Sequence, residues 1–177
     1  LSNYLVKPFS YLRYWLTRDW ASKLLNMLFA TGEFLLLYLI LRPQITLASS
    51  PIMIVLGLVM VLFGTLIYFF VTKLAVFVSF WTPESTWGMM FLFLVFYEIL
   101  SGGIFPLDVL PPALYRALQW TPFPYMAYFP LTVLVGKISL QVAIKILLQS
   151  TFWLLLSYLL VRLQWKKGLK VYQASGK

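Results

Sequence analysis

Few side chains in this sequence are suited to acid–base or nucleophilic chemistry. Cysteine and histidine are both absent, which excludes disulfides, thiolate nucleophiles and histidine-based proton transfer within this chain. Ser101 has no neighbouring base in the sequence that would activate its hydroxyl group. We therefore expect no catalytic residue, no bound cofactor and no metal site.

Two carboxylates stand inside apolar runs, where acidic residues are unusual. Glu33 and Glu98 are each surrounded by hydrophobic residues, and an acid at membrane depth is costly unless it faces water or a protein interior. One interpretation is a proton relay in a coupled transporter. The other is structural, with the acids capping helix ends or pairing with Arg116 or Lys145. The sequence leaves both interpretations open.

The segment Gly136-Lys137-Ile138-Ser139 is similar to the end of a phosphate-binding loop. Such a loop requires an earlier glycine, five positions before the second one, and a Ser or Thr directly after the lysine. Leu131 and Ile138 occupy those two positions. The sequence therefore predicts no nucleotide site.

The composition indicates a membrane protein. Of the 177 residues, 62% are hydrophobic, 19% are aromatic and only 11% are charged, and the mean hydropathy is +0.87. This exceeds what a soluble domain buries, so we expect an all-α polytopic membrane protein. The net charge is +9, but the basic residues lie between the apolar runs and form no continuous patch, so we do not expect a nucleic-acid partner.

Four apolar runs predict membrane-spanning helices, because ~20 helical residues cross a hydrocarbon core of ~30 Å. Residues 1–23, before these runs, combine aromatic and basic side chains at helical spacing, which predicts an amphipathic helix at the membrane surface. Residues 164–177 form a basic tail. We expect one transmembrane domain over residues 1–177, with spans at 24–41, 51–72, 87–105 and 140–163.

Proline and glycine residues refine the prediction for the second span. Pro51 is a favourable first residue of a helix, and we expect the helix to continue past Lys73 as far as Trp81. Gly57 and Gly64 are seven residues apart and therefore lie on one helix face. Small residues at this spacing predict the close approach of another helix.

The stretch from Leu100 to Pro112 interrupts the third span. Gly102 and Gly103 loosen the backbone there, and three prolines forbid a continuous helix: Pro106, Pro111 and Pro112. Unpaired backbone groups at membrane depth must be covered by protein or line a water-filled cavity. We therefore expect residues 106–136 to form a protected re-entrant hairpin.

The basic residues predict the orientation, because Lys and Arg are enriched on the cytoplasmic side. Residues 1–23, 72–86 and 162–177 hold most of the 14 basic residues. Placing these segments in the cytoplasm puts both ends of the sequence inside and the hairpin outside. The remaining basic residues lie on or near the outer side: Arg42, Arg116, Lys137 and Lys145.

Five segments, spread in order over the whole sequence, form a recognisable set: Leu1 to Tyr11, Phe80 to Gly88, Leu100 to Asp108, Pro122 to Pro130 and Trp165 to Gly176. Together they resemble ABC-2 type transporter permeases, most closely the bacterial branch described as drug- or viologen-export-like. Glu98 departs from the family pattern, where no fixed acid is expected.

The resemblance implies six spans in the whole permease, of which this sequence carries the last four. Consistent with this, the sequence begins with Leu1, and we expect a preceding N-terminal portion. The family implies that two cytoplasmic ATPase subunits bind beneath two permeases, so ATP hydrolysis is expected on a separate chain. It also implies a multi-pass protein of the bacterial cytoplasmic membrane.

The resemblance assigns two functional roles of the family to particular residues of this sequence. The resemblance implies that residues 1–20 form the cytoplasmic segment that couples to the ATPase, and it implies that residues 101–136 close the exit on the outer side. The coupling residues would be Lys7, Pro8, Arg13, Trp15 and Arg18. The outer gate would contain Gly102, Gly103, Pro106, Asp108, Pro111 and Pro112.

Several functions fit the pattern to different degrees. We expect an exporter permease that moves a hydrophobic or amphipathic substrate and pairs with itself or a related chain. A proton-coupled secondary transporter that uses Glu33 and Glu98 is the first alternative, and a non-transporting membrane scaffold is the second. An intramembrane enzyme is disfavoured because His and Cys are absent. Aromatic-rich spans suit amphipathic drugs, lipids and peptides alike.

Overall fold

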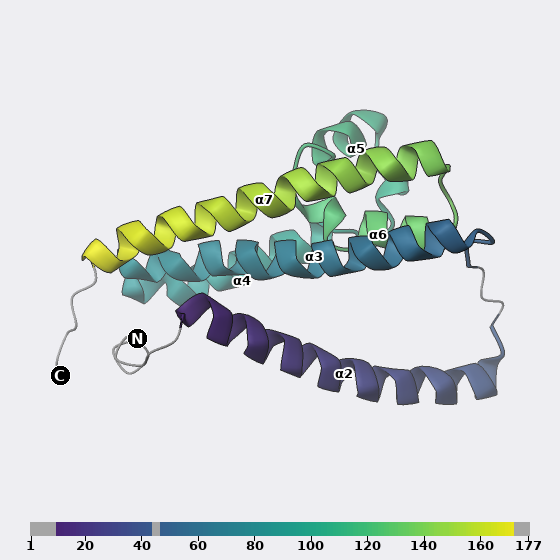
Figure 1. Ribbon diagram of the computed structural model, residues 1–177, viewed down its shortest axis with the longest axis horizontal. Coiled ribbons are helices and arrows are strands. Elements are labelled where there is room, and N and C mark those ends of the chain that lie inside the picture. The colour runs from purple at the N-terminus through teal and green to yellow at the C-terminus, as the bar shows by residue number, and fades with distance from the viewer. Residues whose placement is uncertain (1–9, 44–46, 172–177) are drawn as a thin grey trace. The chain divides into compact units, whose positions relative to one another are not determined.

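The computed structural model describes residues 10–43 and 47–171. Within these ranges the chain is helical and contains no strand (Figure 1). This confirms the predicted all-α class. The chain divides into two compact units, one containing helix α2 and the other containing helices α3 to α7, and each unit is described by itself.

The first unit contains a single long helix. Helix α2 runs without interruption through Tyr11–Leu41, a length of 31 residues. It ends at Arg42, which has a left-handed φ of 43° and whose N–H donates to the Tyr38 carbonyl oxygen. None of its residues is buried. The helix includes both the predicted surface segment and the predicted first span, so the division between them near residue 23 stays a prediction.

Helix α3 is the centre of the second unit. It covers Pro51–Phe77 with proline in its first turn, as predicted, and a 3₁₀ turn continues it through Val78–Phe80. Three other helices pack against α3: α4 (Thr86–Leu100), α6 (Tyr128–Leu134) and α7 (Leu140–Val171). Met60 and Ile67 of α3 are fully buried in the resulting core.

Helices α3 and α7 are held together at the end of α3 by aromatic rings and one polar contact. The rings of Phe77 and Trp165 have centroids 5.1 Å apart, and the Gln164 side-chain amide donates to the Leu74 carbonyl oxygen at 3.1 Å. A Cβ atom at Gly168 would overlap the ring of Phe80. Glycine therefore lets α7 approach this ring closely.

Short elements complete the second unit. Helix α5 begins at a proline and spans Pro112–Leu118. Prolines also occupy the first or second position of two of the three remaining 3₁₀ turns, because a fixed φ suits these positions. The three turns are Pro83–Ser85, Leu107–Val109 and Phe123–Tyr125.

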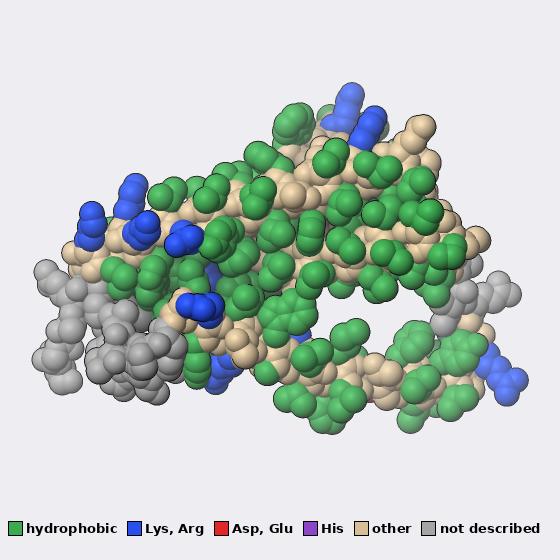
Figure 2. Space-filling model, in the orientation of Figure 1, with side chains coloured by type: hydrophobic (Ala, Val, Ile, Leu, Met, Phe, Trp, Pro, Cys, Tyr) green, Lys and Arg blue, Asp and Glu red, His purple; other side chains and the backbone are tan. Residues whose placement is uncertain are grey.

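Among the described residues, three helical segments are long and apolar enough to cross a membrane, judged by length and composition: Tyr11–Leu41, Pro51–Phe80 and Leu140–Val171. Hydrophobic side chains cover much of the visible face of α3 and α7, and basic side chains gather near the C-terminal end of α7 and around α5 (Figure 2). Helix α4 has 15 residues and a length of only ~22 Å, so the count of four spans stays a prediction.

Candidate functional site

The turn that follows α4 depends on a glycine in a left-handed conformation. The Ser101 N–H still donates to the Tyr97 carbonyl oxygen at 2.9 Å, and Gly102 then adopts a φ of +84°. A Cβ atom at Gly102 would also lie 3.2 Å from Tyr128 side-chain atoms. Any other residue would therefore strain the backbone and crowd Tyr128.

The second glycine of this turn lies against a carboxylate. A Cβ atom at Gly103 would come within 2.8 Å of the Glu98 Oε2 atom, and the Ile104 N–H donates to the Glu98 carbonyl oxygen at 3.3 Å. The structure thus brings the predicted gate residue Gly103 beside the predicted intramembrane acid Glu98. The sequence singled out both residues but did not predict this contact.

Prolines direct the outgoing arm of residues 101–136, the predicted hairpin together with the turn before it, which is called the 101–136 hairpin from here on. Pro106 is extended, with φ −61° and ψ 135°, and the following 3₁₀ turn buries Leu107 completely. Pro111 then precedes α5, and Pro112 is in its first turn. Asp108 is exposed on the 3₁₀ turn. Each proline sits where a fixed φ and a missing N–H are tolerated.

The returning arm is anchored by two tyrosines. The hydroxyl of the fully buried Tyr125 donates to the Gln119 carbonyl oxygen at 2.8 Å, and burial raises the pKa of Tyr125 to about 12. The N–H of Tyr128 donates to the Ser101 carbonyl oxygen at 3.1 Å, which ties the two arms together. Burial, and then the neighbouring Tyr115 and Asp108, raise the pKa of the Tyr128 hydroxyl to about 12.

The hairpin docks onto the glycine face of α3. A Cβ atom at Gly64 would lie 2.7 Å from the Met126 carbonyl oxygen, and one at Gly57 would lie 2.5 Å from a methyl carbon of Leu134. The Ala48 N–H, before α3, donates to the Leu134 carbonyl oxygen at 2.9 Å. The predicted packing role of the two glycines is confirmed, and their partner is the hairpin rather than a spanning helix.

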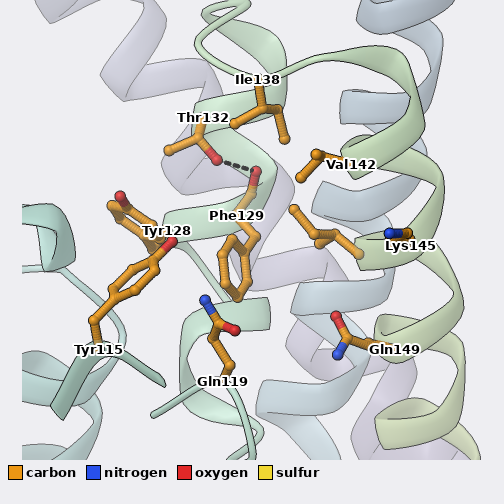
Figure 3. Close-up of a pocket in the computed structure, with 10 residues that line it drawn as sticks. Tyr115, Gln119, Tyr128, Phe129, Thr132, Ile138, Val142, Lys145 and Gln149 are labelled. Carbon is orange, nitrogen blue, oxygen red and sulfur yellow. Dashed lines mark hydrogen bonds between the residues drawn. The ribbon is translucent and has the colours of Figure 1, made fainter. Parts of the chain in front are cut away.

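A cavity of about 270 Å³ lies between the hairpin and α7. Tyr115 and Tyr128 line one side, Lys145 and Gln149 of α7 line the other, and Phe129 lies between them (Figure 3). Its polar groups come from separate elements, so no single motif in the sequence predicts the cavity. Among the described residues, no cluster of acids suited to a metal ion occurs.

The predicted coupling residues lie in the first unit. Lys7 and Pro8 fall outside the described residues. Arg13 and Arg18 are exposed near the start of α2, and the Arg18 guanidinium carbon lies 5.1 Å from the centre of the Trp15 ring. This arrangement is a cation–π contact that leaves two positive charges on the helix surface.

The second predicted acid, Glu33, also lies in this unit, exposed in the middle of α2. In the same helix, the neighbouring Thr31 hydroxyl donates to the Met27 carbonyl oxygen at 2.7 Å, so this part of α2 accommodates polar groups without a break. Glu33 and Glu98 are thus both exposed on helices, but Glu98 lies in the last turn of α4, where its carboxylate is close to Gly103.

Comparison with known families agrees with this architecture. A family model described as "ABC-2 family transporter protein" matches residues 1–176. The chain belongs to the ABC-2 transporter family. This confirms the resemblance found in the sequence and supports a role as a multi-pass permease that is not itself a catalytic subunit. Searches of curated proteins and of solved structures found no match.

Proposed function

We propose that this ABC-2 family chain is the permease subunit of an ATP-driven exporter in a bacterial cytoplasmic membrane. The observation that carries the proposal is the family match over residues 1–176. The substrate would be hydrophobic or amphipathic, because the described helices expose many large apolar and aromatic side chains. ATP would be hydrolysed by separate cytoplasmic subunits.

The start of α2 would couple ATP hydrolysis to transport. Two ATPase subunits that close around ATP would pull on the segment that includes Lys7, Pro8 and the exposed Arg13 and Arg18. This coupling role is supported by the continuity of α2, which spans Tyr11–Leu41 without a break. A displacement at its charged end would therefore be passed along a rigid rod to the proposed span.

The 101–136 hairpin would close the exit on the outer side. Its two arms are joined by the hydrogen bond from Tyr128 to Ser101, and it rests on Gly64 of α3. The hairpin and α3 would therefore move together when the permease opens. The substrate path would lie between two permeases, which are either identical or closely related chains.

The apolar surface of α2 agrees with a position in the membrane. Its second half exposes a nearly continuous set of Leu, Phe and Ile side chains, and none of its residues is buried. Such a surface requires lipid or a protein partner. In the proposed complex, the bilayer and other helices of the permease assembly would cover it.

The decisive experiment is purification of the full-length protein in detergent from its own membranes, with its partners identified by mass spectrometry. We expect a soluble ATPase to co-purify. Changing Arg13 and Arg18 to Glu should remove it, because the reversed charges would repel an acidic docking surface at close range.

A matched control reverses two other basic residues of the predicted cytoplasmic side, Lys166 and Lys167. These residues lie near the end of α7, outside the proposed coupling segment, so the variant should retain the ATPase. A wild-type protein that purifies without any ATPase would contradict the proposal and favour the secondary-transporter or scaffold interpretation. Equal loss in both variants would contradict the role of Arg13 and Arg18.

A further inference from the structure

Lys145 is a cation without a counter-ion in the described part of the chain. It lines the cavity between α7 and the hairpin, and no acidic side chain lies within ion-pair distance of it among residues 10–43 and 47–171. No acidic side chain lines the cavity either. Asp108 lies beside Tyr128 but does not itself line the cavity. The cavity therefore favours a negatively charged occupant.

The position of Lys145 along α7 indicates where that occupant comes from. Residues 146–161 of α7 contain no charged side chain, and Arg162 follows them. Lys145 and Arg162 are thus separated by ~26 Å along the helix axis, which is close to the thickness of a hydrocarbon core once long basic side chains extend toward the headgroups. The Lys145 ammonium group would lie at the level of lipid phosphates.

The other polar groups of the cavity suit a phosphate. Gln119 and Gln149 line it, and their side-chain amides can donate hydrogen bonds. Tyr115 and Tyr128 also line it, and their hydroxyls hydrogen-bond to each other, which leaves one hydroxyl proton of the pair for a ligand. The volume of about 270 Å³ falls below that of pockets that enclose a drug-sized ligand. It suits a headgroup whose apolar tail remains outside, beside the exposed Ile144 and Leu148 of α7.

We propose that this cavity binds the phosphate headgroup of an amphipathic molecule, with Lys145 as the charge partner and Gln149 as a hydrogen-bond donor. Two sources share this chemistry: a phospholipid of the surrounding bilayer and another phosphate-headed amphipath that reaches the outer side. The site is built by the hairpin, α7 and Ile138 of the segment between them. It needs neither ATP nor an ATPase, so its test succeeds or fails independently of the proposed export activity.

Native mass spectrometry of the full-length protein tests the proposal. The purified protein is delipidated and exposed separately to phosphatidylglycerol, to diacylglycerol with the same acyl chains, and to soluble glycerol phosphate. We expect Lys145→Gln to reduce retention of phosphatidylglycerol about tenfold, because a charged hydrogen bond is lost. Diacylglycerol should bind weakly to both proteins. Arg116→Gln is the matched control, since Arg116 is exposed on α5 nearby but does not line the cavity.

Comparing the three ligands distinguishes the two possible sources of the phosphate headgroup. Lys145-dependent binding of glycerol phosphate would show that the headgroup alone suffices, whereas a requirement for acyl chains would identify a membrane amphipath. The mass of the molecule that co-purifies from native membranes then separates bilayer phospholipid from another phosphate-headed amphipath. Each of these results supports a phosphate site.

Three results would overturn the proposal: unchanged retention of phosphatidylglycerol in Lys145→Gln, an equal loss in Arg116→Gln, or equal binding of phosphatidylglycerol and diacylglycerol to the wild type. If Lys145→Gln does not fold, the variants Gln149→Leu and Lys145→Arg test the phosphate site instead. The first should weaken binding several-fold by removing one donor, and the second should preserve binding. The opposite pattern would refute the site.

Discussion

The glycines of α3 differ in what a methyl group at each position would meet. At Gly57 the closest atoms belong to the flexible side chain of Leu134, at 2.5 and 2.6 Å. At Gly64 they are the backbone carbonyl oxygens of Met126 and Tyr125, at 2.7 and 2.8 Å. A side-chain terminus can rotate away, whereas a buried backbone carbonyl can move only if the hairpin moves. Gly64 is therefore the more restrictive position.

We expect Gly64→Ala to destabilise the protein by ~1–3 kcal/mol, the usual effect of overpacking a well-packed interior. Gly57→Ala should have a smaller effect. Gly88→Ala is the matched control, because a Cβ atom there would meet nothing within 4 Å and alanine raises helix propensity by ~1 kcal/mol. Thermal unfolding in detergent, followed by size-exclusion fluorescence, measures the order. Equal melting temperatures for the Gly64 and Gly88 variants would contradict the contact.

Among the elements, the hairpin is held in place by its own backbone at the point where its two arms meet. Gly102 sets the direction of the chain after α4 with its φ of +84°, and the Tyr128 N–H bonded to the Ser101 carbonyl oxygen closes the loop. The Glu98 carboxylate lies against Gly103 at the same turn. In the proposed gate, the segment would move as one piece, because the Tyr128–Ser101 hydrogen bond meets the chain next to the turn at Gly102.

We expect Gly103→Ala and Pro106→Ala to uncouple ATP hydrolysis from export without preventing ATPase binding. The first would push the Glu98 carboxylate aside, and the second would free the φ of the turn and alter its conformational entropy by ~0.4–1 kcal/mol. Export per ATP hydrolysed should fall several-fold, while the ATPase still co-purifies. Gly88→Ala, at the other end of α4, serves as the control. Normal export by both hairpin variants would contradict the proposed role of residues 101–136 as a gate.

Local sequence signals specified most helix starts and ends. Proline is in the first turn of both α3 and α5, and the glycine–proline cluster follows the end of α4. These signals are local, because a fixed φ and a missing N–H group affect only a few neighbouring residues. What Gly57 and Gly64 pack against could not be predicted in this way, since the hairpin lies far along the chain. The cavity polar groups, Tyr115 and Lys145 among them, likewise meet only through tertiary packing.

The whole molecule combines a positive net charge of +9 with helices whose apolar surfaces remain largely exposed. These properties agree with a permease that needs both a bilayer and partner subunits. The glycine-mediated contact between the hairpin and α3 and the ring contact between α3 and α7 lie at different points along α3, so one central helix connects them. Movement of α3 would therefore reach both contacts together.

The source of energy for transport is a property of the whole assembly, and Glu33 and Glu98 allow it to be tested. Glutamine matches glutamate in shape but cannot carry a proton, so the double change to Gln preserves the packing of residue 98 against Gly103 and removes any relay. For an ATP-driven exporter, we expect uptake of a fluorescent amphipathic dye into inverted vesicles to stay within about twofold of wild type.

This uptake should require ATP and should persist when the pH gradient is collapsed. Glu84→Gln is the matched control, because Glu84 lies in the 3₁₀ turn Pro83–Ser85 and outside the apolar runs. If the double variant loses uptake while the Glu84 variant keeps it, and a pH gradient alone drives the wild type, the protein is a proton-coupled transporter. That result would assign the carboxylate beside the hairpin turn to proton movement rather than to gate packing.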